Sequence, residues 1–141
     1  MEQRAADRAP RGAGGREKVK PAPFPARNGK RPFNASGVVA VGERRFVFVD
    51  NKDPGSLFEL TLDADTDVAV RIRRRRLAGA GGGALGDPEG LARVDRDGEI
   101  FFIVASSLSV ARGREINDGL LRVRYGAGGD LPAEVMSGFR E

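Results

Sequence analysis

Short apolar runs separated by turn-forming residues make up the chain from residue 34 onward. The runs are rich in β-branched and aromatic residues and end in Gly, Asp, Asn or Pro, which is typical of antiparallel strands joined by tight turns. No helical spacing of apolar residues competes with this pattern. The sequence therefore predicts an all-β fold with essentially no helix. The expected strands are 36–41, 45–49, 57–62, 68–73, 89–94, 99–105, 119–125 and 133–139.

The same order of strands occurs twice in the sequence. SGVVAV matches EGLARV, RFVFVDN matches IFFIVASS, and SLFELTLDAD matches GLLRVRYGAGGD. Gly37 and Gly90 lie 53 residues apart, and Phe48 and Phe102 lie 54 apart. The chain thus contains an internal repeat of four-stranded units.

Four short strands in a unit of about 40 to 50 residues are typical of β-propeller blades. We therefore expect two antiparallel blades, at about 34–77 and about 87–141. A closed ring needs roughly four to eight blades, so two blades form an incomplete ring. The chain is then a fragment or truncated relative of a longer propeller; the alternatives are several copies that assemble, or an ordinary small antiparallel β domain.

One strand has an unusual cationic face. Along 68–73, apolar residues alternate with Ala69, Arg71 and Arg73, so one side of this strand is apolar and the other is charged. The run 71–76 is expected to charge an outer strand and discourage edge pairing, with phosphate binding as the alternative. From Arg74 to Gly86 we expect a flexible, Gly-rich connector.

Polar residues gather where the repeated hairpins open. In an up-and-down blade the innermost strand begins, and the next strand ends, at the same end of the ring, so the polar residues of both blades should share one rim. Glu89 is expected to point into the mouth, within reach of Asp50 or Asn51. The predicted ligand-binding rim consists of Asn34, Ser36, Asp50, Asn51, Asp53, Asp87, Glu89, Ser106, Ser107 and Ser109.

Carboxylate, amide and hydroxyl oxygens on one rim suit Ca²⁺, which takes six to eight oxygen ligands. Glu89, Asp87 and Asp50 are the candidate metal ligands. The alternative is that these residues form turns and bond only to local backbone. Two other acidic runs, 63–67 and 95–99, resemble calcium loops but lack the spacing and distal Glu of an EF-hand, so we predict hairpin turns there.

Composition removes several kinds of chemistry. The 141 residues include no Cys and no His, which excludes thiolate and imidazole metal sites, disulfides, and Ser-His or Cys-His catalysis. No apolar run approaches the roughly 20 residues of a membrane span.

The net charge of +4 is unevenly placed. Residues 1–32 hold nine Lys or Arg and three acids, a net of +6, whereas the rest of the chain carries a net of −2. This basic, Pro- and Gly-rich tail is predicted to be disordered and would bind nucleic acid only non-specifically. Because it lacks an apolar signal core, we expect a cytoplasmic protein as written, or a secreted or periplasmic one if the true N-terminus differs.

A family resemblance rests on five segments: ASGVVAV, FVFVDNKDPGSLFEL, DPEGLARV, FFIVASSLS and GLLRVRY. Over about 34–141 the chain resembles the N-terminal part of bacterial β-propellers of an uncharacterised domain-of-unknown-function family, which are similar to esterase-like-phytase and quorum-regulated propellers. The resemblance is most specific at Asp87, Glu89 and Gly90. It implies a propeller with a polar channel mouth that takes calcium or a phosphorylated or ester ligand.

Three functions follow as expectations. The first is a module that binds a small molecule or a protein at the channel mouth without catalysis. The second is a calcium-dependent phosphoester or ester hydrolase of the phytase or esterase-like type, in which a metal-bound water would need no histidine. The third is non-specific polyanion binding through the basic tail.

Overall fold

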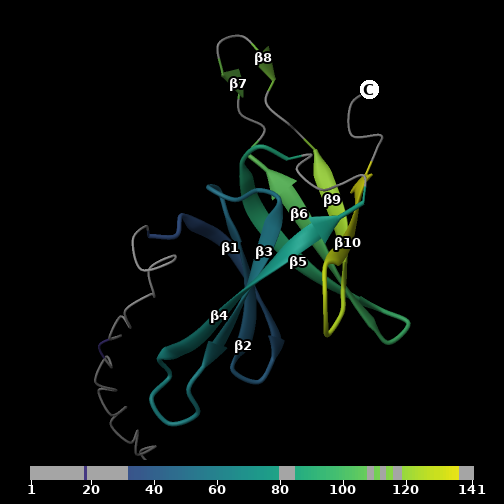
Figure 1. The fold of residues 1–141 in the computed structure, drawn as a ribbon. Helices are drawn as coiled ribbons and strands as arrows, with labels where there is room; N and C mark the ends of the chain where they lie inside the picture. Colours follow the sequence, from purple (N-terminus) through teal and green to yellow (C-terminus); the bar gives the residue numbers. More distant parts are fainter. Residues whose placement is uncertain are drawn as a thin grey trace, which may run out of the picture.

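The computed structural model of the protein (Figure 1) describes residues 18, 32–79, 85–107, 110–111, 114–115 and 119–136. These residues contain strands and turns and no helix, so the all-β prediction is confirmed. The strands are β1 (Ala35–Gly42), β2 (Arg45–Asp50), β3 (Ser56–Leu62), β4 (Ala69–Ala78), β5 (Pro88–Arg96), β6 (Glu99–Ser106), β7 (Val110–Ala111), β8 (Arg114–Glu115), β9 (Leu120–Tyr125) and β10 (Leu131–Met136).

Eight of the strands form one sheet, in the order β1-β2-β3-β4-β10-β9-β6-β5. Neighbours are antiparallel except β4 and β10, which run parallel and pair Leu77 with Leu131 and Ala78 with Pro132. The repeated four-stranded order is therefore present, in a first unit (β1 to β4) and a second unit (β5, β6, β9 and β10). The β4–β10 pairing joins the two units into a single sheet that nearly closes as a barrel.

The barrel nearly closes where β1 and β5 lie alongside each other without forming a ladder. Ser36 Oγ donates to the carbonyl of Pro88 at 2.8 Å, and Arg93 Nη1 donates to the carbonyl of Ala40 at 2.9 Å. Gly37 permits this approach, since a Cβ at that position would lie 2.7 Å from the backbone nitrogen of Leu91. The glycine of the repeated SGVVAV segment is thus required by close packing of backbones.

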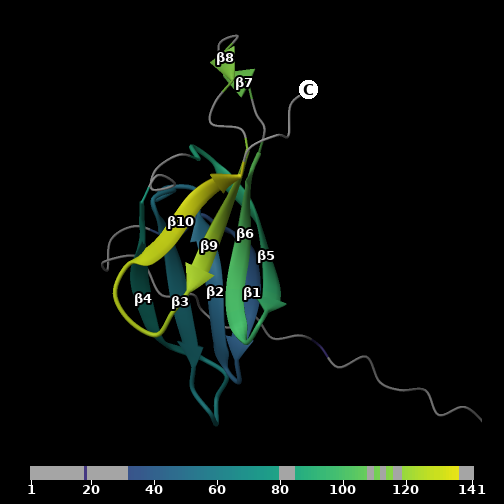
Figure 2. The ribbon, with the colours of Figure 1, turned by 90° about the vertical axis from the view of Figure 1, so that its right-hand side faces the viewer.

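The hydrophobic core lies between the two units, which Figure 2 shows as two layers facing each other. Full burial of each valine, leucine or phenylalanine stabilises the fold by roughly 1.5–3 kcal/mol, so this layer holds the units together. The central residues, all at most 2% exposed, are Val47, Val49 and Leu57 from the first unit and Phe102, Val104, Leu121 and Val123 from the second.

The outer face of the first unit carries a second, aromatic cluster. Phe48 and Phe58 stack with ring centroids 5.3 Å apart, and Phe33 packs edge-on against both, at 5.3 and 5.1 Å. These rings lie on the side of β2 and β3 that points away from the second unit.

The fourth strand and the last strand are longer at one end than the sequence predicts. β4 continues to Ala78, through the first part of the expected connector, and β10 begins at Leu131 rather than at Ala133. The pairing with β10 involves only Leu77 and Ala78, which lie beyond the arginine run that was expected to discourage edge pairing. Among the arginines at 71–76 only Arg75 is buried, at 1% exposed, and it bonds to the β9–β10 loop.

The basic tail lies outside the described residues, apart from Lys18 and Pro32. Within the described part of the chain, no helix has the length and apolar character needed to cross a membrane.

Candidate functional site

The predicted rim is built by equivalent backbone bonds in the two units. In the first unit Asn51 donates its backbone N–H to the carbonyl of Asn34 at 3.2 Å, and in the second Ser107 donates to the carbonyl of Asp87 at 2.9 Å. Asp50 is fully buried, and its Oδ1 accepts from the backbone nitrogens of Asn34 and Lys52 at 3.1 and 3.0 Å. Asp50 therefore fixes the start of β1 against the turn that follows β2.

Side chains from both units meet at this rim as expected. Asn51 Nδ2 donates to Glu89 Oε1 at 2.9 Å, so the predicted proximity of Glu89 and Asn51 is observed. Ser36 Oγ lies 3.1 Å from Oδ1 of Asn51. The side chains of these three residues thus form a small polar bridge between the two units, where β1 lies alongside β5.

Other predicted rim residues have local structural roles. Asp53 forms a two-point ion pair with Arg74, with Nε–Oδ2 at 2.6 Å and Nη2–Oδ1 at 3.2 Å. Ser106 is buried, and its Oγ accepts from the backbone nitrogen of Gly119 at 3.1 Å. Ser109 lies outside the described residues.

The described carboxylates of the rim do not form a cluster of the kind that binds calcium. In the ranges that the structure describes, no three or more acidic side chains come together as a metal site would require, and Oδ1 of Asp50 accepts from backbone amides. Calcium at Glu89, Asp87 and Asp50 remains a prediction. A calcium titration of thermal unfolding, compared with Glu89→Gln, would test it.

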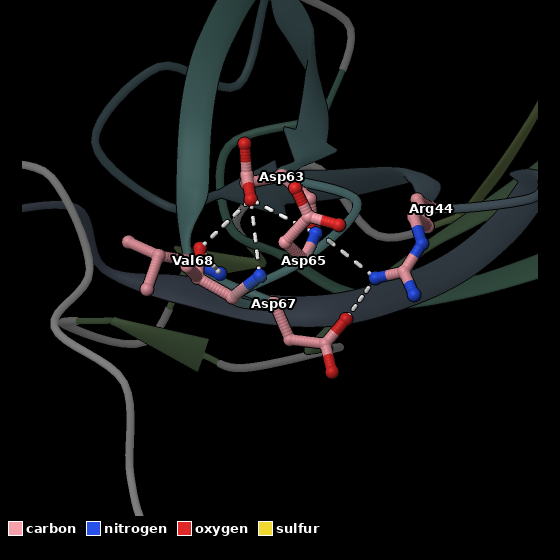
Figure 3. Close-up of polar contacts among 6 residues, drawn as sticks. Arg44, Asp63, Asp65, Asp67 and Val68 are labelled. Carbon is pink, nitrogen blue, oxygen red and sulfur yellow. Dashed lines mark hydrogen bonds and ion pairs between the residues drawn. The ribbon is translucent and has the colours of Figure 1, made fainter.

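The run 63–67 forms a hairpin turn, as predicted (Figure 3). Asp63 Oδ1 accepts from the backbone nitrogens of Asp65 and Thr66 at 2.9 and 3.0 Å, and these bonds lower the pKa of Asp63. Arg44 Nη1 donates to the Asp63 carbonyl at 3.1 Å and forms an ion pair with Asp67. The carboxylate of Asp63 is thus occupied by its own turn.

The second acidic run is also a hairpin turn. Asp97 and Gly98 have φ angles of 52° and 76°, the left-handed conformation required at both centres of a type I′ turn. This Asp-Gly pair connects β5 to β6, as the sequence predicts.

A cavity, which we call the seam pocket, lies between the two units at the end opposite the rim. Its volume is about 430 Å³. It is lined by Arg45, Glu59, Thr61, Arg71, Arg73, Gly98, Glu99, Ile100, Tyr125, Gly126 and Ala127.

Strand register explains why cations gather in the seam pocket. Arg45 pairs with Thr61 and Thr61 with Arg71, which places these three side chains in one row across β2, β3 and β4. Glu59 pairs with Arg73 in the next row. Because side chains alternate between the faces of a strand, arginines 71, 73 and 75 all face the second unit.

The deepest of these arginines is held by many partners. Arg75 Nε donates to the carbonyl of Gly129 at 2.8 Å, and Nη2 donates to those of Gly126 and Gly128 at 2.7 and 3.2 Å. Its remaining nitrogen forms an ion pair with Glu59. Arg75 therefore ties the β9–β10 loop of the second unit to the first.

Tyr125 completes the wall on the side of the second unit. Its hydroxyl donates to Glu59 Oε1 at 2.9 Å, and the guanidinium of Arg75 lies 5.8 Å from its ring centroid. Burial and the bond to Glu59 raise the pKa of Tyr125. The ring thus stays neutral and offers a flat surface beside the arginines.

The seam pocket has an uncompensated positive charge. Glu59 is paired with Arg75, and Glu99 is paired with Arg124. Arg45, Arg71 and Arg73 have no carboxylate partner within the described ranges; Arg73 makes one long bond, 3.5 Å, to the carbonyl of Ala127. Three guanidinium groups are therefore available to an anion in the cavity.

This pocket was not predicted from the sequence, although Arg71 and Arg73 were recognised as one charged face of a strand. The alternation at Arg71 and Arg73 was visible, but the run 71–76 was expected to charge an outer strand and discourage edge pairing, with phosphate binding as the alternative. The informative signal was Glu59, a lone acid on the neighbouring strand that can pair with this face.

Comparisons of the chain with protein-family models, with curated proteins and with solved structures found no match. The fold and the geometry of the seam pocket therefore carry the functional argument.

Proposed function

We propose that this chain is a ligand-binding module of the β-propeller type, and that its ligand is a small multivalent anion held in the seam pocket. The observation that carries the proposal is the group of three arginines without carboxylate partners, Arg45, Arg71 and Arg73, around one cavity. The face-to-face packing of two four-stranded antiparallel units is compatible with neighbouring blades.

The chemistry of the lining favours a dianionic oxyanion such as a phosphate group or a polycarboxylate. Arginine binds both through two parallel hydrogen bonds, and such charge-assisted bonds are stronger than neutral ones. A cavity of about 430 Å³ falls within the range of small-molecule sites, roughly 300–1,000 Å³. Tyr125 and Ile100 supply apolar surface for the rest of the ligand.

Binding without catalysis is the better reading of this lining. Glu59 is paired with Arg75 and accepts from the Tyr125 hydroxyl, and Glu99 is paired with Arg124, so both carboxylates of the pocket already have structural partners. Thr61 offers a hydroxyl, but no base pairs with it among the described residues. The calcium-dependent hydrolase remains an alternative prediction, and no cluster of three or more acidic side chains among the described residues supports it.

Calorimetry at low ionic strength tests the proposal, with pyrophosphate and citrate as the two probes. The wild-type protein should bind at least one of them, and Arg71→Met should weaken binding about tenfold or more, since one hydrogen bond to a charged group contributes about 1.5–3 kcal/mol. Arg76→Met is the matched control, because it removes the same charge from the opposite face of β4.

Anion binding by the basic tail would contribute equally to both variants, because both retain the tail. Anion binding that Arg71→Met leaves unchanged, or that Arg76→Met weakens equally, would show that the seam pocket is not the site. No binding of either probe by the wild type would also contradict the proposal.

A further inference from the structure

The second unit exposes a sheet face that has no counterpart packed on it. On this face, which we call the open face, Phe101 and Ile103 are partly exposed and Val94 is 43% exposed. The guanidinium of Arg122 lies 5.8 Å from the ring centroid of Phe101. Grooves of about 250 and 200 Å³ lie on this face, and Phe101 and Arg122 line both.

Strand register identifies the equivalent face of the first unit. One row of the open face runs from Ala92 through Ile103 and Arg122 to Glu134. The equivalent row of the first unit is Val39, Val47, Glu59 and Arg73. Both rows have two apolar residues on the inner strands and an opposite-charge pair on the outer strands, with the signs exchanged.

In the first unit, the face that contains Val47 is covered by the second unit. Val47 is fully buried there, whereas Ile103 at the matching position is only partly buried. The repeat thus contains one contact surface twice, once filled and once open.

The covering surface also occurs twice. In the second unit it includes Phe102, Val123 and Ala133, which share one row and lie in the core. The equivalent row of the first unit runs through Ala40, Phe46, Leu60 and Ile72 on its outer face.

This outer face is apolar and partly accessible. Phe46, Leu60 and Ile72 are partly exposed, and Val38, in the adjacent row, is 60% exposed. Phe33 packs on the rings of Phe48 and Phe58 in that adjacent row, so the row of Phe46 is the part available to a partner.

We infer that the open face binds the outer face of the first unit of a second copy of this chain, in a head-to-tail contact. A second copy is the occupant because the row of Phe46 on this outer face is equivalent to the row of Phe102, which fills the matching site within the chain. Charge permits the contact, since Arg122 pairs with Glu134 and Arg124 with Glu99, which leaves the open face neutral. The inference does not depend on the anion pocket.

Head-to-tail contacts can repeat until a ring closes. Each copy contributes two units, and propeller rings contain roughly four to eight, so assemblies of about two to four copies are expected. Such an assembly would cover the apolar surface that each isolated copy exposes.

Two exposed valines allow each surface to be disabled without disturbing the core. Val94→Glu charges the open face and Val38→Glu charges the outer face of the first unit. Val135→Glu is the control: Val135 is 51% exposed and lies in the row of Leu121, on neither proposed surface. Circular dichroism and cooperative unfolding would verify that all three variants fold.

Sedimentation velocity measures the outcome. The wild type and Val135→Glu should form two- to four-copy species up to about 100 μM, and each of the other two variants alone should be monomeric. An equimolar mixture of Val94→Glu and Val38→Glu should form a two-chain complex, because one intact copy of each surface remains. A monomeric wild type would overturn the inference, and so would a mixture that stays monomeric, because one intact copy of each surface should be enough to join two chains.

Discussion

Replacing Arg75 by methionine should cost more stability than any other single charge removal on β4. Arg75 is 1% exposed, and its partner Glu59 is 19% exposed. Methionine keeps much of the apolar volume of the side chain but supplies no donor, so it removes the ion pair and the three hydrogen bonds to the β9–β10 loop together.

The size of the stability loss follows from the groups that lose their partner, which are the Glu59 carboxylate and the three loop carbonyls. Removing one partner of a buried ion pair typically costs about 3–5 kcal/mol, because the other charge stays buried and uncompensated. The carbonyls of Gly126, Gly128 and Gly129 add less, since these residues are exposed and water can replace the lost donor. For a domain of this size 1 kcal/mol shifts the midpoint by about 4–8 °C, so the melting temperature should fall by at least about 12 °C.

Urea unfolding followed by circular dichroism gives the free energy of unfolding of each variant. Arg76→Met, an exposed position on the same strand, should stay within about 0.5 kcal/mol of wild type. Adding Glu59→Gln to Arg75→Met should recover part of the loss, because it removes the uncompensated carboxylate. Equal stabilities for the two arginine variants, or a double variant less stable than Arg75→Met alone, would refute the reasoning.

Two further predictions concern the backbone and the turns. Gly37→Ala should lower the free energy of unfolding by about 1–3 kcal/mol, because the added Cβ would lie 2.7 Å from the backbone nitrogen of Leu91. Gly42→Ala is the control and should cost less, because its Cβ would meet only the flexible end of the Arg45 side chain, at 3.2 Å. Equal losses for the two variants in urea unfolding would contradict the close approach of β1 and β5. Asp63→Ala should destabilise the protein at pH 7, and this difference should shrink as the pH falls below the unfolded pKa of 3.8 and through the lower folded pKa; a difference that stays constant from pH 7 to pH 2 would show that the ionised carboxylate does not stabilise the turn.

Local signals in the sequence were sufficient for the strands and turns. Alternating β-branched and aromatic runs predict strands by contacts between neighbours in sequence, and Asp97-Gly98 predicts its turn because few residues adopt its φ angles. The proximity of Glu89 and Asn51 also followed, since the repeat places the start of one strand beside the end of the next.

Contacts between residues far apart in sequence were not predictable in this way. Arg75 is buried because Glu59 and three carbonyls at 126–129 surround it, and none of these lies near it in sequence. The parallel pairing of β4 with β10 depends on the same long-range arrangement. The predicted equivalence of Phe48 and Phe102 was misleading for a related reason. Val38 pairs with Phe48 in the first unit, and its equivalent Leu91 pairs with Val104 in the second. The residue equivalent to Phe48 is therefore Val104, 56 residues further along the chain.

The most direct test of anion binding is a crystal of the protein soaked in tungstate, a tetrahedral dianion whose metal scatters anomalously. We expect an anomalous peak in the seam pocket, within hydrogen-bonding distance of the Arg71 and Arg73 guanidinium groups, and its loss in Arg71→Met crystals. A peak elsewhere on the protein with none in the seam pocket would contradict anion binding at this site.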